Sequence, residues 1–349
     1  MQRAADASRE SRFSTKNGLR RLACGAVAVW IAAGHPPAAA SENTDPSRPT
    51  ANAVGLGETA EVTPAHVYQL VGKVEKQIES LRLALGKPEI AVLPIRFESA
   101  VPEKVFFQAA ALRNQAKRLS HEWKLTPAAE PPWPTGEIVP ADVYRQVRAT
   151  SESLRRVAAR LGNEDVHELP GFDPDKTPTD AFNAIFVANR RLDHLLEKQA
   201  APSDVYEQVT VALNYANLLR RRFPGRQIPP EPEFEPNQTP CNVYQQLLDC
   251  LQIIGRIAED AGTSSMRYSG AVQKGTVRPG DVYSLAVLVV AELRAIENHI
   301  LDEVPDIQGY YAGKKTPSHA FQRAQLLARQ LEAIESLTQN HRHAVSEAK

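Results

Sequence analysis

Apolar residues recur at alternating four- and three-residue steps along eight stretches of this chain. In the first stretch these positions are Val67, Val71, Val74, Ile78, Leu81 and Leu85. An average step of about 3.5 residues keeps such positions on one stripe of an α-helix and is typical of helices in left-handed bundles. The pattern therefore predicts eight helices of roughly 20 to 24 residues each.

A proline stands at the start of every stretch, at Pro64, Pro102, Pro140, Pro178, Pro202, Pro240, Pro279 and Pro317. Proline suits the first helical position because its φ is already helical and no partner is needed for the N–H it lacks. Threonine precedes it in TPAH, TPTD, TPCN and TPSH and can cap the free N–H groups. Acids stand two residues after the proline at Asp142, Asp180, Asp204 and Asp281, which favours the positive end of the helix dipole.

The prolines follow one another at intervals of 38, 38, 38, 24, 38, 39 and 38 residues. The short interval divides them into two sets of four, which indicates a tandem duplication. We therefore expect an all-α fold made of two tandem four-helix bundles, residues 61–200 and 201–340, followed by a polar tail at 341–349. A continuous α-helical solenoid is the alternative, although solenoid repeats normally hold two helices in about 34 to 47 residues.

The direction of neighbouring helices is harder to predict. Tyrosine follows the first seam valine in the odd-numbered stretches, while phenylalanine occupies this position in three even-numbered ones, which indicates an ancestral two-helix hairpin and up-down neighbours. The connections, of about 15 residues, are longer than the two to eight usual between antiparallel helices. Extended at ~3.3 Å per residue, they are also long enough to return along a helix and leave neighbours parallel.

Most connections carry one aromatic residue shortly before the next proline, at Phe97, Trp133, Phe172, Phe234 or Tyr311. Such a residue in a polar loop usually packs on its own domain, so we expect ordered connections. The join between the two blocks is short, with only Gln199, Ala200 and Ala201 between Lys198 and Pro202. The two blocks should therefore be closely coupled.

The first forty residues are typical of an export signal. Basic residues end at Arg20-Arg21, an apolar run covers 22–33, and Ala38-Ala39-Ala40 precede the expected cleavage site. The apolar run is shorter than the roughly 20 residues of a membrane span, and no later stretch is long enough. We expect a signal peptide at 1–40, a disordered linker at 41–60, no transmembrane segment after cleavage, and a periplasmic or secreted protein. The general and twin-arginine export routes both stay open.

With 349 residues, of which 42% are hydrophobic, the chain can bury a sizeable core. Lys+Arg and Asp+Glu both number 41; without residues 1–40, which hold six basic and two acidic residues, 35 bases face 39 acids. This mild acidity excludes a strongly basic nucleic-acid-binding surface. Cys241 and Cys250 lie about 13 Å apart along one expected helix, too far for a disulfide.

Candidate chemistry is sparse. The seam holds no charged residue and no histidine, only Thr150 and Cys250 as polar residues, with Gln199 and Thr338 if those helices continue, so no cofactor or metal is expected in a bundle core. Glu164 to His167 matches a metal-binding spacing but follows Gly162 in a connection. His194 beside Asp193 and Glu197, and His299 beside Glu297 and Asp302, are expected on solvated faces. We predict no enzyme site.

The repeated aromatics are the candidate binding residues. They are Tyr68, Tyr144, Tyr206, Tyr283, Trp133, Phe172, Phe234 and Tyr311. The tyrosines either pack across helix interfaces or line a shared aromatic pocket at one end of each bundle. The sequence favours an exported, non-enzymatic protein-binding or scaffold module of the cell envelope, with an envelope protein as partner. A small-molecule-binding or sensory bundle is the alternative, and an enzyme of unknown type is third.

Overall fold

The computed structural model describes residues 61–347 except positions 92, 164–167, 224–227, 274, 301–304, 306, 308, 311–312 and the side chains of 340–347. The expected signal peptide and linker lie outside the described residues. The described part is all-α, as predicted, and each helix begins at one of the eight prolines. The helices are α1 (Pro64–Ala84), α2 (Pro102–Glu122), α3 (Pro140–Arg160), α4 (Pro178–Leu195), α5 (Pro202–Arg220), α6 (Pro240–Asp260), α7 (Pro279–Ile300) and α8 (Pro317–Glu347).

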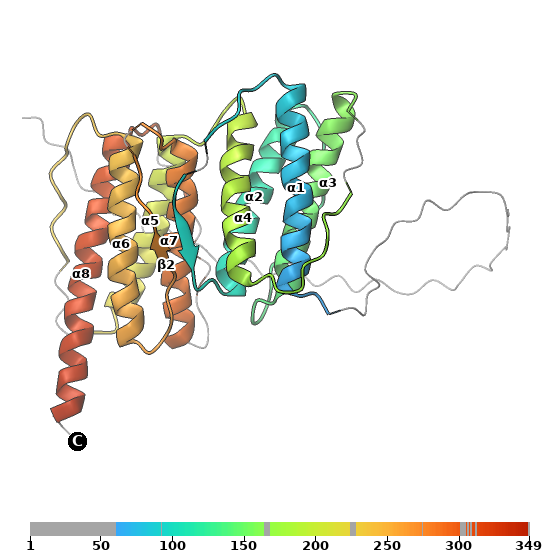
Figure 1. The fold of residues 1–349 in the computed structure, drawn as a ribbon. Helices are drawn as coiled ribbons and strands as arrows, with labels where there is room; N and C mark the ends of the chain where they lie inside the picture. The colour runs from blue at the N-terminus through green and yellow to red at the C-terminus, as the bar shows by residue number, and fades with distance from the viewer. Residues whose placement is uncertain are drawn as a thin grey trace, which may run out of the picture. The chain divides into compact units, whose positions relative to one another are not determined.

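The helices pack in two groups of four (Figure 1). In the first group, which comprises α1 to α4, neighbours follow one another around the group in the order α1, α3, α2, α4. The second group repeats this arrangement as α5, α7, α6, α8. The first and second helices of each group, and likewise the third and fourth, therefore face each other diagonally, whereas α2 and α3, and α6 and α7, are neighbours.

The four helices of each group run parallel, so the expectation of up-down neighbours is wrong. Pro64, Pro102, Pro140 and Pro178 line one shallow apolar hollow at the common N-terminal end of the first group. Pro202, Pro240, Pro279 and Pro317 line its counterpart in the second group. The seam could not reveal this, because a 3.5-residue stripe looks the same in a parallel and an antiparallel bundle.

The connections make this direction possible by returning along a neighbouring helix. Residues 85–101 leave the end of α1 and run back along α4. At one end the His194 ring nitrogen Nε2 contacts the Pro88 carbonyl at 3.0 Å, and at the other Ala100 donates its N–H to Thr179 Oγ1 at 3.0 Å. Every carbonyl or N–H bonded in this way ties the connection to the helix beside it.

Two further connections return in the same manner. The one before α4 follows α1, where Gln69 donates to the Pro170 carbonyl at 2.7 Å. The one before α6 follows α8, where Arg329 donates to the Pro230 carbonyl at 3.1 Å. These extended segments therefore cover helix faces and are part of the fold.

In a parallel group the four positive ends of the helix dipoles lie together and repel one another. A hydrogen-bond acceptor at the third helical residue offsets part of this repulsion. In seven of the eight helices that the structure describes, this residue accepts a hydrogen bond from the backbone N–H that precedes the proline. The acceptors are His66, Asp142, Asp180, Asp204, Asn242, Asp281 and His319. In α2 the position holds Lys104, which points instead toward the second group.

The predicted seam forms the core. Its residues are buried along each helix, among them Val71, Val147 and Ile254, all with no exposed surface. At the ends of α1, α2, α3, α5, α6 and α7 the last seam residue is less buried, as at Ile300, which is 42% exposed. Full burial of an aliphatic side chain stabilises the fold by about 1.5 to 3 kcal/mol, so the seam is the main source of stability.

Two short strands, which the sequence did not predict, join the two groups. β1 (Arg96–Glu98) pairs antiparallel with β2 (Arg267–Ser269), placing Phe97 opposite Tyr268. Gly270 follows β2 with φ +103°, and a Cβ there would lie 1.8 Å from the Pro94 oxygen. Three-residue strands leave too short an alternation to detect in a sequence.

Buried ion pairs also join the groups. Lys104 of α2 lies 2.9 Å from Glu292 of α7, and both side chains are 1% exposed. Arg190 of α4 pairs with Asp281 of α7, where burial raises the pKa of the carboxyl and Arg190 lowers it by less. α2 and α7 run in opposite directions, because Lys104 at the start of α2 meets the later part of α7.

Replacing Lys104 tests how the buried Lys104–Glu292 pair affects the free energy of unfolding. Lys104→Met leaves the Glu292 carboxylate buried without a cation and should lower the free energy of unfolding in urea by about 3 to 5 kcal/mol. Adding Glu292→Gln should restore most of it, because the amide oxygen can still accept the bond from the Met266 N–H. Arg155→Met, which breaks an exposed pair, serves as control and should change stability by less than about 1 kcal/mol. Equal losses in the single and double variants would contradict the buried-pair account.

Candidate functional site

A trough runs along the first group between α1 and α4. It consists of three hollows that share lining residues. The largest, about 700 Å³, lies between Tyr68 and Glu75; the second, about 620 Å³, continues from Glu75 to Leu83; the third, about 200 Å³, ends at His194. The extended connections that return along α4 and α1 form its two walls.

Glu75 and Arg191 occupy the middle of the trough. Glu75 lines the first two hollows and Arg191 the last two. Their side chains are 30% and 38% exposed, and the closest oxygen and nitrogen are 3.8 Å apart, beyond hydrogen-bond distance. Burial raises the pKa of Glu75, and Arg191 lowers it by less. The carboxylate is thus partly desolvated and only loosely paired.

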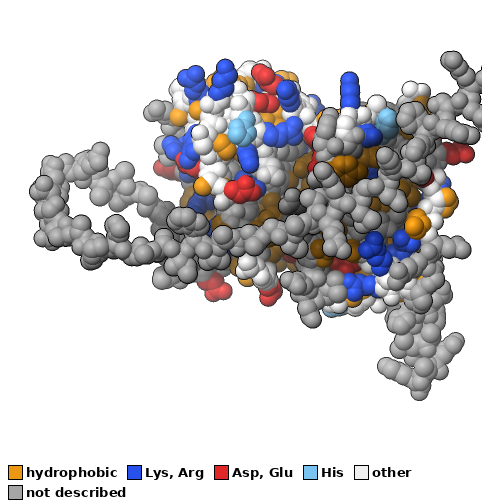
Figure 2. Space-filling view, turned by 180° about the vertical axis from the view of Figure 1, so that it is seen from behind, with side chains coloured by type: hydrophobic (Ala, Val, Ile, Leu, Met, Phe, Trp, Pro, Cys, Tyr) orange, Lys and Arg blue, Asp and Glu red, His pale blue; other side chains and the backbone are white. Residues whose placement is uncertain are grey.

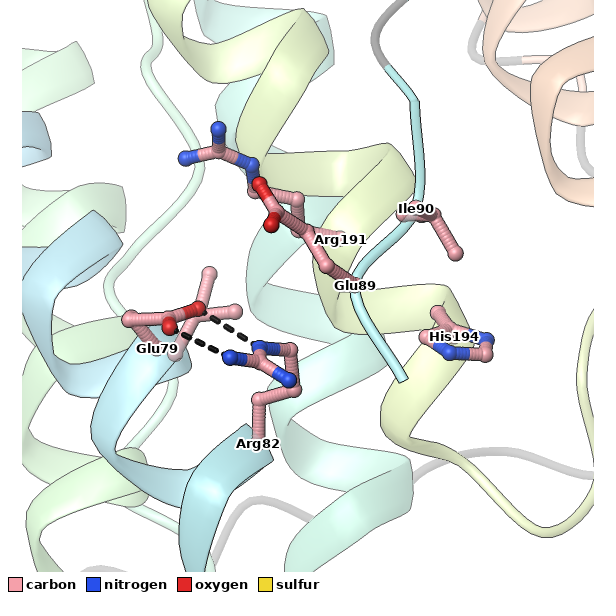
Figure 3. Close-up of a pocket in the computed structure, with 7 residues that line it drawn as sticks. Glu79, Arg82, Glu89, Ile90, Arg191 and His194 are labelled. Atoms are coloured by element: carbon pink, nitrogen blue, oxygen red, sulfur yellow. Dashed lines mark hydrogen bonds and ion pairs between the residues drawn. The ribbon is translucent and has the colours of Figure 1, made fainter. Parts of the chain in front are cut away.

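The third hollow gathers ionisable groups from both helices (Figure 3). Arg82 donates to both carboxylate oxygens of Glu79, at 2.8 and 2.7 Å, and these bonds hold the pKa of Glu79 below its usual value. A third donor of Arg82 reaches the Lys87 carbonyl at 2.6 Å. Glu79 and Arg82 therefore form a fixed pair along one side.

His194 lines the same hollow, and both of its ring nitrogens contact groups that lie outside it. Arg278 lies 2.7 Å from Nδ1, and because a guanidinium only donates, Nδ1 is the acceptor and Nε2 carries the proton given to the Pro88 carbonyl. Burial and Arg278 lower the pKa of His194. With both ring nitrogens bonded, the imidazole is neutral and has no lone pair free for general-base chemistry.

The predicted tyrosines occupy two kinds of place. Tyr68 lines the largest hollow, and Lys176 Nζ lies 5.0 Å from the centre of its ring. In the second group Lys315 Nζ lies 4.7 Å from the centre of the Tyr206 ring. Tyr144 and Tyr283 pack against the core, and burial raises the pKa of Tyr283 to about 12. The hollows at the common N-terminal ends are lined by proline, valine and alanine instead.

The aromatics of the connections anchor these segments to their own helix group. Phe97 packs edge-on against Phe182 and Phe186, at 5.3 and 5.0 Å between ring centres. The predicted binding residues Trp133, Phe172 and Phe234 contact Phe106, His66 and His319, at 5.1, 4.7 and 5.0 Å respectively. They remain 44 to 49% exposed. Tyr311 lies outside the described residues.

Of the trough residues, Tyr68 was predicted from the sequence as a candidate and His194 only as part of a solvated face, and the others were missed. Glu75 and Arg191 stand off the apolar seam, where charged residues are ordinarily solvated. The sequence nevertheless contained a signal, because the equivalent positions in the second set of four helices hold Leu213 and Gln330. A charge in one half and a neutral residue in the other distinguishes these positions from an ordinary polar helix face.

The expected solvated face around His194 is wrong, and the one around His299 is wrong for Glu297. His194 and Asp193 are 8% and 3% exposed, and Glu297 is fully buried against Arg222. They are off the seam of their own group, but α4 also packs against its covering connection and against α7, contacts that helix periodicity does not reveal. His299 is exposed as expected. The segment from Glu164 to His167 is outside the described residues.

The described residues can be checked for a disulfide, a metal site and a membrane-spanning helix. Cys241 and the buried Cys250 are unbridged, as predicted. Among the described residues, no group of three His, Cys, Asp or Glu side chains is placed to hold a metal ion. No described helix is both long and apolar enough to cross a membrane. On the face shown in Figure 2, basic and acidic side chains are interspersed with apolar ones.

Comparisons with known protein families, with curated proteins and with solved structures found no match. The interpretation of the site therefore depends on its own geometry.

His194 provides a test of the site's electrostatics through pH. The unfolded chain protonates this histidine near its ordinary pKa of about 6.5, whereas the folded protein does so only at lower pH. Protonation thus favours the unfolded state as the pH falls. Between about pH 7 and pH 5, the free energy of unfolding should decrease more in the parent protein than in His194→Gln. His299→Gln, which removes an exposed histidine, should keep the parent's pH dependence. Identical pH profiles for the parent and His194→Gln would contradict the assignment.

Proposed function

We propose that this chain is an exported, non-enzymatic protein-binding or scaffold module of the cell envelope, in which a cleaved signal peptide precedes two tandem four-helix bundles. The observation that carries the proposal is the trough on α1 and α4. It is open to solvent, it extends over most of the length of α1, and its walls are fixed to the helices by hydrogen bonds. A rigid, elongated surface suits recognition of another chain.

Exposed apolar side chains beside the trough support a protein partner. Leu83, which lines the middle hollow, is 64% exposed. Leu169 and Phe172, on the connection along α1, are 43% and 49% exposed. These apolar groups are spread along the trough next to charged ones, a mixture that resembles the composition of protein interfaces.

The arrangement of ionisable groups favours binding over catalysis. The Glu79 carboxylate is held by Arg82 and both His194 nitrogens are bonded, so these groups are not poised to transfer protons. The third hollow, at about 200 Å³, also supports the second candidate function, a small-molecule-binding or sensory module. Its paired charges would suit a ligand that carries both signs.

Native mass spectrometry distinguishes the two candidates. The mature protein would be purified gently from the envelope of the cells that make it, and its intact mass compared with cleavage after Ala40. A reproducible additional mass of protein size is expected. A small bound mass in its place would favour the ligand-binding module, and a bare chain would contradict a stable complex.

A further inference from the structure

The two helix groups provide an internal comparison for the trough. The prolines at the helix starts place α1 and α4 in register with α5 and α8, and the Tyr68–Lys176 and Tyr206–Lys315 contacts occur at matching places. Both helix pairs are neighbours in their groups. A residue that differs between the α1–α4 face and the α5–α8 face is therefore not needed for the packing of these helices.

Three positions differ in charge. Glu75, Glu79 and Arg191 in the first group correspond by spacing to Leu213, Asn217 and Gln330 in the second. Leu213 and Gln330 are buried, whereas Glu75 and Arg191 are half-buried and line the trough. The α5–α8 pair packs with neutral residues at these places, so packing of α1 on α4 does not explain the charges.

We propose that the trough on α1 and α4 binds an extended segment of a partner protein, with a lysine or arginine side chain of that segment paired to Glu75. This inference names the ligand class of the surface in the proposed function and rests on it.

The shape of the trough favours an extended segment. From Tyr68 to Arg82 the helix rises about 21 Å at 1.5 Å per residue, and an extended chain at ~3.3 Å per residue covers this length with about six residues. The hollows are continuous through Glu75, Glu79 and Arg191. A small molecule would fill only one of them.

Basic and acidic residues both line the trough, so the choice of a basic side chain depends on Glu75 itself. Glu79 is already bonded to Arg82, and Asp180 at the other end caps its helix through the Thr177 N–H. Glu75 has Arg191 as its ion-pair partner among the described residues, at 3.8 Å. Glu89 also lines the third hollow, but it is exposed to solvent. Glu75 is therefore the half-buried trough carboxylate with acceptor capacity left for a cation that displaces the remaining water. Leu83 lies further along the same wall and offers apolar contact to a neighbouring residue.

The test uses four fluorescein-labelled heptapeptide pools with acetylated and amidated ends. Their central residue is Lys, Arg, Gln or Glu, and the other positions are equal mixtures of Ala, Val, Leu and Ser. Fluorescence polarisation with the mature protein should show the Lys and Arg pools binding about tenfold tighter than the Gln pool, as expected for a charge-assisted bond. The Glu pool should bind weakest.

Two variants locate the effect. Glu75→Leu introduces the residue that the second group carries, and Glu75→Gln preserves shape; both should remove the preference for Lys and Arg, with folding checked by circular dichroism. Glu231→Gln, which changes an exposed residue outside the trough, should keep it. A preference unchanged in both Glu75 variants would overturn the assignment.

Other outcomes would also decide against this inference. Equal binding of all four pools, or of none, would remove the basic segment as ligand. Nα-acetyl-lysine amide binding as tightly as the Lys pool would indicate a small-molecule site. If native mass spectrometry still detects a bound protein in these cases, the trough assignment fails while the scaffold function stands.

Discussion

The architecture requires long connections that return along a neighbouring helix, as those before α2, α4 and α6 do. This return lets four helices run parallel, brings their N-terminal ends together and covers faces that would otherwise be exposed. Parallel dipoles repel, and the hydrogen bonds from third-position residues such as Asp142 and Asp180 offset part of that cost. The pairs of extended segments along α1 and α4 also create the trough, so the candidate site follows from the same feature as the fold.

Contact between the helix groups imposes a second requirement. Lys104 stands where the other helices carry a capping residue, and it is committed to Glu292 instead. Buried pairs of this kind contribute little net stability, because desolvation of two charges offsets their attraction. They do penalise any misaligned contact, since each charge would then be buried alone. The polar interface therefore favours one register between the groups.

Local patterns in the sequence were sufficient for the helices and their buried faces. The prolines located each helix start, and the 3.5-residue stripe identified core residues such as Val71 and Val147. The same stripe contains no information about helix direction, so the parallel order was missed. Lys104 and Asp193 were missed for a related reason, because a charged residue off the seam looks solvated until a second helix group covers it, and Glu297 was missed because it is buried against Arg222 within its own group. Glu75 was recognisable only by comparison with Leu213.

The parallel order of the helices can be measured as a distance between two helix starts. Glu61 and Glu137 are exposed and stand just before the first prolines of α1 and α3. Each would be replaced by cysteine and spin-labelled in a protein whose own free cysteines are removed by Cys241→Ser and Cys250→Ala. Because α1 and α3 are neighbours, pulsed dipolar spectroscopy should give a distance well below ~31 Å, the length of a 21-residue helix. A distance at or above that length would show that the two helices run in opposite directions and would contradict the account.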